Sequence, residues 1–331
     1  MDYISKKDIK LPKRKQTAKK GDNGRVLIVG GSKEYTGAVA LAGLAALRCG
    51  ADWVTVAAPE KVAWAVNCLS ADLVTVKLKG DYFSPVHANE VIELANKHDV
   101  VLLGNGIGLK EETKNFAQKI IKEIKKFIVL DADGIKALSS NDLRNAIITP
   151  HIKELEIFMQ NSNIKNSIIK TITNEKNTQK KALLIKNSLK EFFDRNNVLL
   201  LKGAVGVVIS KNNILLNKNV EPGMTKAGTG DVLAGLCAGF LAQSRNLQQS
   251  AVNATYFCGL IEKMLLKKKK GFTYLASDMV MEIKKILENE KLPSMEEMFR
   301  IGDKLKQKRR YSTEEVIEIS HGLRKKNATS N

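Results

Sequence analysis

Continuous apolar runs alternate with segments of helical spacing through the first half of this chain. Residues 25–30 read RVLIVG, an apolar strand that ends in glycine, and residues 36–49 then carry small and apolar side chains at helical spacing. Runs that are apolar on both faces and alternate with helices are typical of a mainly parallel sheet covered on both sides. The pattern predicts further strands at residues 53–57, 73–76, 100–103, 127–130 and 146–149, and helices at residues 60–69, 87–97 and 111–125.

The second half of the chain carries shorter runs. Residues 198–201, 205–210 and 214–216 are separated by turns, which predicts an antiparallel edge to the same sheet. Residues 232–242 are the most apolar window and are too short to cross a bilayer, so we expect a buried core helix there. Residues 160–190 are rich in Asn and Lys and predict one imperfect helix, at 175–189, within a decorated crossover of the same domain.

Length and patterning together predict the domain organisation. The chain has 331 residues, of which 44% are hydrophobic, ample for a buried core. We expect a single α/β domain at residues 1–291, with its core at about 21–287, and a helical, partly ordered extension at 292–331, where acidic and basic stretches alternate. The Lys-rich first twenty residues contain no apolar signal sequence, so we expect a cytoplasmic protein.

The net charge of +19 raises the question of nucleic-acid binding. The basic runs lie apart, at residues 10–20, 267–270 and 304–310, and aromatic residues make up only 5% of the chain, so stacking platforms for bases are scarce. A solvated, Lys-rich surface explains the charge more simply. The four cysteines form no C-x-x-C pair, and we expect them to be reduced core residues. We expect neither a nucleic acid nor a membrane as a partner.

Glycine-rich loops follow two of the predicted strands. Ligands of a parallel sheet gather outside the carboxyl ends of its strands, so these loops belong to the candidate site. The strand at 25–30 is followed by the small-residue segment Thr36–Ala38, and the strand at 100–103 by the sequence GNGIG, Gly104–Gly108. Each loop suits the close approach of a ligand, and each could equally be a tight turn between strand and helix.

Residues with ionisable side chains follow three other strands. Asp131 and Asp133 come after residues 127–130; they could bind magnesium through water or cap a helix, and capping is the favoured interpretation. His151 follows residues 146–149 and could cap a turn or contact the ring of a ligand. Lys202 and Gly203 follow residues 198–201 and offer a cation and an accessible backbone to a nucleotide phosphate.

The glycine-rich turn Gly228–Asp231 precedes the most apolar helix. The unpaired N–H groups and the dipole of a helix start attract anions, and glycines let a phosphate approach the backbone closely. We therefore expect an anion hole at Gly228, Thr229 and Gly230. Asp231 could be an N-cap, but the favoured interpretation is a base that accepts a hydroxyl proton beside the bound phosphate.

Taken in order, these motifs resemble the ADP/ATP-dependent NAD(P)H-hydrate dehydratase family, which has a ribokinase-like fold. The resemblance covers about residues 21–287 and includes VLIVGGS with YTGA, TPH with Glu154, LKG, and PGM before GTGDVLAG. Lys153, Gly206 and Ala227 depart from the family's usual residues. The resemblance implies a three-layer α/β/α architecture and two groups of binding residues. Those expected to line the hydrated dinucleotide are Ala38, Gly106, His151 and Asp231, and those expected to hold the adenine nucleotide are Lys202, Gly203, Ala204, Val205, Gly206 and Gly230.

The resemblance also implies a reaction. The expected enzyme is an ADP-dependent (S)-NAD(P)H-hydrate dehydratase, a lyase that repairs hydrated NADH or NADPH by phosphorylating the C6 hydroxyl and eliminating phosphate, while ADP becomes AMP. ATP is the alternative donor, Mg²⁺ accompanies the nucleotide, and no metal-ligating residue is assigned. A homo-oligomer and a separate NAD(P)H-hydrate epimerase are the expected protein partners.

Two other functions fit parts of the sequence. A ribokinase-like kinase for a small vitamin precursor would use the same glycine turn and aspartate, but its product would stay phosphorylated. A basic nucleic-acid-binding protein on a kinase-like fold would show strongly salt-dependent binding and no turnover. The first glycine loop and the TPH segment favour the dehydratase.

Overall fold

The computed structural model describes residues 2–218, 225–269, 271 and 273–291. Contacts group Met1–Lys284 into one compact unit and Lys285–Asn331 into a second, of which only residues 285–291 are described. The predicted extension at 292–331 lies outside the described residues. The predicted domain boundary therefore stays a prediction.

Within the described residues, ten strands form one sheet in the order β1-β10-β9-β8-β7-β6-β5-β2-β3-β4. Neighbouring strands are parallel except at β9, which is antiparallel to both β8 and β10. The strands are β1 (Asp2–Tyr3), β2 (Arg25–Val29), β3 (Trp53–Pro59), β4 (Val74–Leu78), β5 (Val100–Leu103), β6 (Phe127–Leu130), β7 (Ala146–Ile148), β8 (Val198–Leu201), β9 (Gly206–Ile209) and β10 (Ile214–Asn217).

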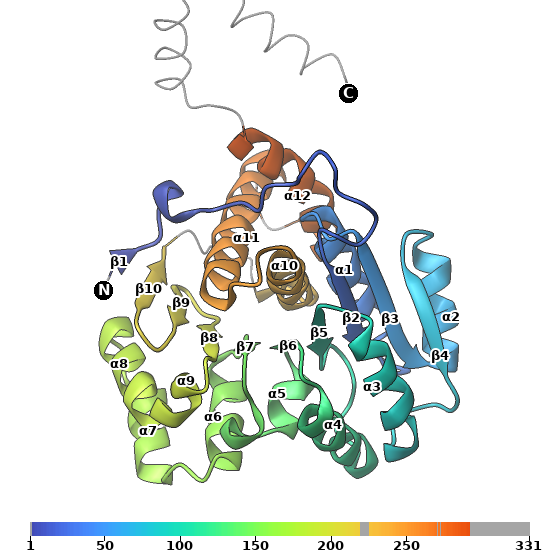
Figure 1. Ribbon diagram of the computed structural model, residues 1–331. Helices are drawn as coiled ribbons and strands as arrows, with labels where there is room; N and C mark the ends of the chain where they lie inside the picture. Colours follow the sequence, from blue (N-terminus) through green and yellow to red (C-terminus); the bar gives the residue numbers. More distant parts are fainter. Residues whose placement is uncertain (1, 219–224, 270, 272, 292–331) are drawn as a thin grey trace, which may run out of the picture. The chain divides into compact units, whose positions relative to one another are not determined.

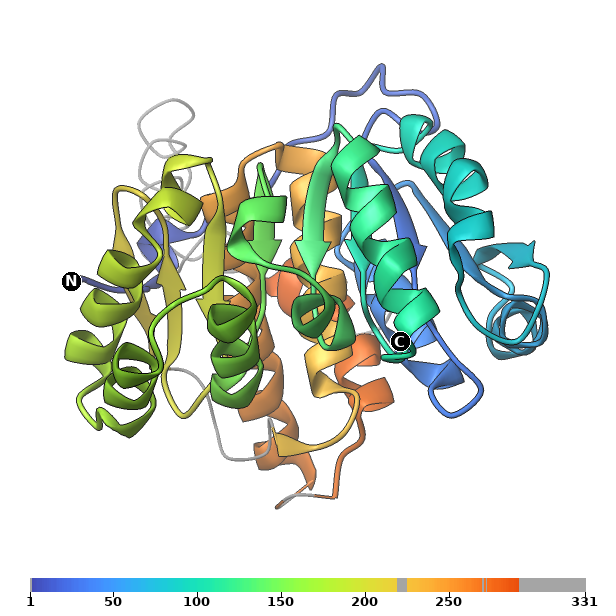
Figure 2. The same ribbon diagram turned by 90° about the horizontal axis from the view of Figure 1, so that it is seen from below.

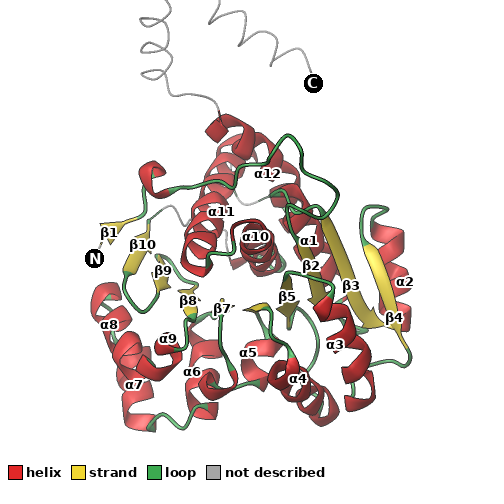
Figure 3. Cartoon of the chain, in the orientation of Figure 1, coloured by secondary structure: helices red, strands yellow, loops and turns green. Residues whose placement is uncertain are grey.

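Helices cover both faces of this sheet, as Figures 1 and 2 show. One face carries α1 (Thr36–Arg48), α2 (Glu60–Leu69), α10 (Thr229–Ser244) and α11 (Leu247–Lys269). The other carries α3 (Ala88–Asn96), α4 (Glu111–Glu123), α5 (Asp133–Ala137), α6 (Ile152–Asn161), α7 (Asn166–Asn174), α8 (Thr178–Ser188) and α9 (Lys190–Asp194). The remaining helical elements are α12 (Ala276–Lys291), η1 (Lys6–Asp8), η2 (Pro85–His87) and η3 (Ser140–Asp142). The predicted three-layer α/β/α architecture with a mainly parallel sheet is confirmed (Figure 3).

The segment at residues 160–190 contains more helix than its composition predicts. One imperfect helix at 175–189 was expected, and α8 corresponds to it, but α7 precedes it within the segment and α9 follows at the segment's end. Each of the three buries a pair of side chains: Ile169 and Ile172, Ala182 and Ile185, and Phe192 and Phe193. Two apolar residues per short helix suffice to anchor it to the core, but they are too few to produce a clear periodic signal among so many Asn and Lys residues.

Helix α10 is the predicted buried helix. Every residue from 232 to 242 is buried, because the helix lies between the sheet and two other helices, α1 and α11. Gly235 makes this packing possible, since a Cβ there would collide with the backbone of Ala42 on α1. No helix in the described part of the chain is both long and apolar enough to span a membrane.

The cysteines are mostly where the sequence predicts. Cys49, Cys237 and Cys258 are free and buried. Cys68 is free but exposed, so its expected core position is wrong. The buried face of α2 is formed by Val62, Ala63 and Val66, and Cys68 lies on the opposite side of the helix.

The strand register brings the candidate site together. Val29, Leu103, Leu130 and Ile148 are in register across β2, β5, β6 and β7, so the loops that follow these strands emerge at one edge of the sheet. The chain order reverses between β2 and β5, which is the position where α/β sheets open a crevice for ligands.

Candidate active site

The loops after β2 and β5 meet at this reversal point. The Gly31 N–H donates to the Asn105 carbonyl oxygen at 2.8 Å, and Gly106 is buried against Tyr35. Ala38 is half-buried in the first turn of α1. Two of the predicted dinucleotide positions, Ala38 and Gly106, thus belong to elements that adjoin at one end of the sheet.

The glycine turn forms the start of α10. Gly228 is the N-cap with φ 89°, a left-handed conformation that glycine adopts without strain. The Thr229 N–H donates to the Lys226 carbonyl at 3.3 Å, whereas the N–H groups of Gly230 and Asp231 have no protein acceptor among the described residues. The Gly230 and Asp231 N–H groups are therefore available to an anion, and the anion hole expected at Gly228, Thr229 and Gly230 stays a prediction.

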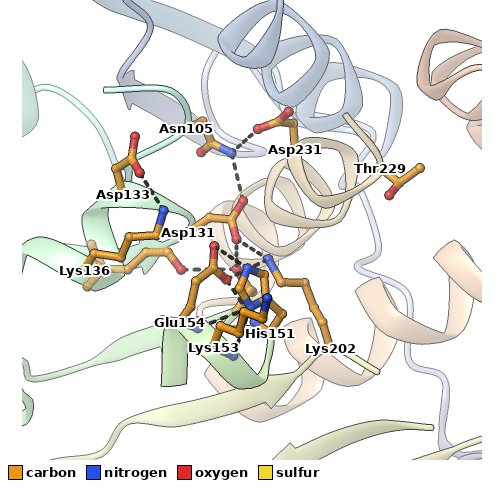
Figure 4. Close-up of polar contacts among 12 residues, drawn as sticks. Asn105, Asp131, Asp133, Lys136, His151, Lys153, Glu154, Lys202, Thr229 and Asp231 are labelled. Atoms are coloured by element: carbon orange, nitrogen blue, oxygen red, sulfur yellow. Dashed lines mark hydrogen bonds and ion pairs between the residues drawn. The ribbon is translucent and has the colours of Figure 1, made fainter. Parts of the chain in front are cut away.

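Asp231 does not cap its helix. Its Oδ1 instead accepts a hydrogen bond from Asn105 Nδ2 at 2.7 Å, and the same nitrogen donates to Asp131 Oδ2 at 3.1 Å (Figure 4). One amide group thus joins two carboxylates that lie a hundred residues apart in the sequence.

Lys202 continues this network toward β8. Its Nζ lies 2.8 Å from Asp131 Oδ1 and 3.5 Å from Glu154 Oε2, and all three side chains are largely buried (Figure 4). Thr149 Oγ1 also donates to Asp131 Oδ1, at 2.7 Å. Burial alone lowers the pKa of Lys202, but the Asp131 and Glu154 carboxylates outweigh it and hold this pKa above its ordinary value. Lys202 therefore stays charged.

The position of Asp231 raises its pKa from 3.8 to about 6. The largest cause is burial, which disfavours the charged form; the Asn105 hydrogen bond opposes it, Asp131 adds to it, and Lys202 opposes it. A carboxylate that titrates close to neutral pH can accept a proton more readily than an ordinary aspartate.

His151 caps a helix, which is one of the two roles that the sequence predicts for it. It is the N-cap of α6, where its Nδ1 accepts from the Lys153 and Glu154 N–H groups, while Glu154 Oε2 accepts from the His151 N–H at 2.9 Å. Its Nε2 lies 3.4 Å from Glu154 Oε1. The ring is half exposed and borders the pocket described below, so capping and ligand contact are compatible.

The favoured capping interpretation of Asp131 and Asp133 is wrong. The N-cap of α5 is Ala132, and neither carboxylate accepts from an N–H group of that helix. The Asp131 carboxylate instead accepts hydrogen bonds from Asn105, Thr149 and Lys202. Asp133 accepts from the Gly108 N–H at 3.1 Å and pairs with Lys136 at 2.9 Å, which ties the loop after β5 to α5.

A pocket of about 660 Å³ opens beside the network. It brings together most of the residues predicted for the adenine nucleotide, and it also includes His151, which was predicted for the dinucleotide. Val205 differs from the others, since its side chain packs against the core. The lining residues are His151, Leu200, Leu201, Lys202, Gly203, Ala204, Gly206, Thr225, Lys226, Thr229, Gly230, Leu233, Thr255, Cys258 and Gly259.

Sequence reasoning missed two parts of this site. Asn105 was quoted only as part of a glycine-rich loop and was given no role. The available signal was a polar side chain between two glycines, in the loop that follows a fully buried strand. Thr255, Cys258 and Gly259 come from α11, a helix that the pattern analysis did not delimit. Their spacing of three and four residues, all with small side chains, was the available signal for a face lining a cavity.

Comparisons with known proteins point to one family. Residues 26–285 match the family model described as NAD(P)H-hydrate dehydratase. The chain is 36% identical, over 85% of its length, to the bifunctional NAD(P)H-hydrate repair enzyme Nnr of Methanothermobacter thermautotrophicus, but spans only 53% of that protein. It is 32% identical to the ADP-dependent (S)-NAD(P)H-hydrate dehydratase of Nitrosopumilus maritimus, over 84% of this chain and 93% of that one.

A solved structure shares the fold. The ADP/ATP-dependent NAD(P)H-hydrate dehydratase of Bacillus subtilis, co-crystallised with ATP and Mg²⁺, aligns with a TM-score of 0.69 and 20% identity, over 88% of this chain and 99% of that one. The family match over most of the chain and the relatives above 30% identity confirm the resemblance that the motifs predict. The chain belongs to the NAD(P)H-hydrate dehydratase family.

Proposed function

We propose that the chain is an ADP-dependent (S)-NAD(P)H-hydrate dehydratase, which restores NADH or NADPH from their hydrates. One observation carries the proposal: Asp231, a partly buried carboxylate whose pKa is raised to about 6, lies at a helix start that adjoins a nucleotide-sized pocket. Family membership supports the same activity, and the name of the Nitrosopumilus relative supports ADP as the donor, with ATP as the alternative.

The pocket suits the phosphate donor. Its volume of about 660 Å³ is within the usual range for small-molecule sites, and leucines line part of it for a base or sugar face. Lys202 and Gly230 line the pocket; the first supplies a positive charge and the second a backbone N–H group, and both would bind the phosphates.

Magnesium fits this pocket as a companion of the nucleotide. In the described residues, no group of three or more His, Cys, Asp or Glu side chains could hold a metal ion by itself. Magnesium in nucleotide sites is usually bound by one or two carboxylates together with phosphates and water. The described lining of the pocket contains no carboxylate, so the phosphates and water would supply most of the ligands, and the ion would offset charge on the phosphates.

Asp231 would act on the hydrated ring. It accepts the proton of the C6 hydroxyl, whose oxygen attacks the terminal phosphorus of ADP; the P–O bond to AMP breaks and AMP leaves. The lone pair of the ring nitrogen then expels phosphate, and loss of the C5 proton restores the dihydronicotinamide. The first step turns hydroxide, a poor leaving group, into phosphate, a good one.

The test mixes hydrated NADH with protein, Mg²⁺ and ADP. Recovery of the dihydronicotinamide absorbance, with one AMP and one phosphate released per NADH formed, is the expected result. A phosphorylated product without phosphate release would instead indicate a vitamin-type kinase. No turnover with either ADP or ATP would overturn the proposal. A homo-oligomer, a separate epimerase and a cytoplasmic location remain predictions alongside it.

A further inference from the structure

Asn105 is fully buried, and its side chain lies between the carboxylates of Asp131 and Asp231. Its backbone is held on both sides: its carbonyl accepts from Gly31, and the neighbouring Gly104 N–H donates to the Val29 carbonyl at 3.1 Å. The side chain therefore starts from a fixed point on the loop after β5.

The orientation of the Asn105 amide is also determined. Its nitrogen donates to both Asp231 and Asp131, at 2.7 and 3.1 Å, which uses its two hydrogens. The reversed amide would place an oxygen against two carboxylates, so only the observed orientation is compatible with them.

This orientation leaves the amide oxygen without a partner. Asn105 Oδ1 is buried and has no hydrogen-bond partner among the described residues. A buried acceptor without a donor destabilises the fold, and such groups in native proteins tend to occur at functional positions. The Asn105 amide thus donates to both carboxylates while its own oxygen accepts no hydrogen bond from the described residues.

We infer that Asn105 is a positioning residue for the Asp231 carboxylate. Its amide fixes the direction of that carboxylate and lets it remain ionised next to Asp131 in a buried site. The inference rests on the proposed function for its kinetic consequence, but the contact and its electrostatic effect belong to the protein alone.

The other charges around Asp231 do not replace this hydrogen bond. Asp131 opposes ionisation of Asp231, and Lys202 favours it but is already paired with Asp131 at 2.8 Å. Two further charged residues belong to the helices that pack against α10. Glu262 on α11 accepts a hydrogen bond from the Tyr274 hydroxyl, and Arg48 lies in the last turn of α1. The Asn105 amide is the group that donates directly to the Asp231 carboxylate.

Two variants test this role. Asn105→Ala and Asn105→Leu both remove the donor, but the first leaves a space and the second fills it. Both should raise the pKa of Asp231, so the acidic limb of the kcat/KM profile should move to higher pH. Activity at a given pH on that limb should fall roughly tenfold for each pH unit of the move, and part of the loss should be recovered at higher pH. The KM for ADP should stay within about twofold.

Asn197→Ala provides the matched control. Asn197 is also a buried asparagine, and its side chain bonds only to backbone groups, of Ala146, Leu143 and Phe192. Its replacement should lower the melting temperature without moving the pH profile. An unchanged acidic limb in both Asn105 variants, with rates reduced equally at every pH, would overturn the inference in favour of a structural role.

A second measurement does not require turnover. The Asp231 carboxyl can be titrated by NMR in protein labelled with ¹³C at aspartate, with Asp231→Asn used to assign the signal. A higher pKa in the Asn105 variants supports the inference, and an unchanged pKa overturns it. Because this readout needs no substrate, failure of the proposed function and failure of the Asn105 role can be told apart.

Discussion

Replacement of Asp231 by asparagine separates the chemical role of this residue from its structural one. The variant keeps the size of the side chain and an oxygen that can accept from Asn105 Nδ2, which donates to the wild-type carboxylate at 2.7 Å. It removes the ability to accept a proton. If Asp231 is the base, turnover should fall roughly a hundredfold or more. Affinity for the hydrated dinucleotide should change much less.

The same substitution should stabilise the protein at neutral pH. Folding raises the pKa of Asp231 from 3.8 to about 6, so the folded state holds its proton more tightly than the unfolded state. This contribution to stability is complete below pH 4 and is lost as the pH rises through 6, a difference of up to about 3 kcal/mol. An asparagine does not ionise, so the variant should melt several degrees above the wild type at pH 7 and near it at pH 4.

Two measurements on the same preparations check this reasoning. Single-turnover dehydration with saturating ADP and Mg²⁺ reports the chemical step, and thermal melts at pH 4 and pH 7 report stability. Wild-type rates in Asp231→Asn would refute the catalytic role. A lower melting temperature of Asp231→Asn at pH 7 would refute the argument that the substitution removes a partly buried charge that destabilises the fold.

Other changes have distinct expected effects. Lys202→Met leaves the buried Asp131 carboxylate without its cation, so urea unfolding should show a loss of about 3 kcal/mol and calorimetry a weaker affinity for ADP; unchanged values for both would contradict the ion-pair assignment. Gly228→Ala places a side chain at φ 89° and should cost about 1–3 kcal/mol, whereas Gly37→Ala, in an open helical position, should be neutral or stabilising. Truncation after Leu292 should leave turnover intact, because the removed residues follow every site residue in the sequence; loss of activity in a folded truncation would assign them a role in the site or its assembly. Nucleic-acid binding should be weak and vanish near physiological salt, and sub-micromolar, sequence-selective binding there would revive the rival function.

The sequence by itself predicted the elements that depend on local pattern. Buried strands such as β5 are continuous apolar runs, and residues 232–242 of α10 are apolar without interruption, so burial on all sides is visible in the composition of each segment. The α7 and α9 helices were missed; each buries only two apolar side chains, which gives a weak periodic signal in so short a segment. The order of motifs along the chain was also sufficient to predict the family.

Only the tertiary structure decided how the site residues are paired. Asn105 and Asp231 are 126 positions apart, and Asp131 and Lys202 are 71 apart, so no local pattern could show that they are in contact. The strand register places their loops at one edge of the sheet, and burial there requires each charge to find a partner. Whether an aspartate caps a helix, pairs with a lysine or titrates near neutral pH depends on those partners. The residue type is the same in each case.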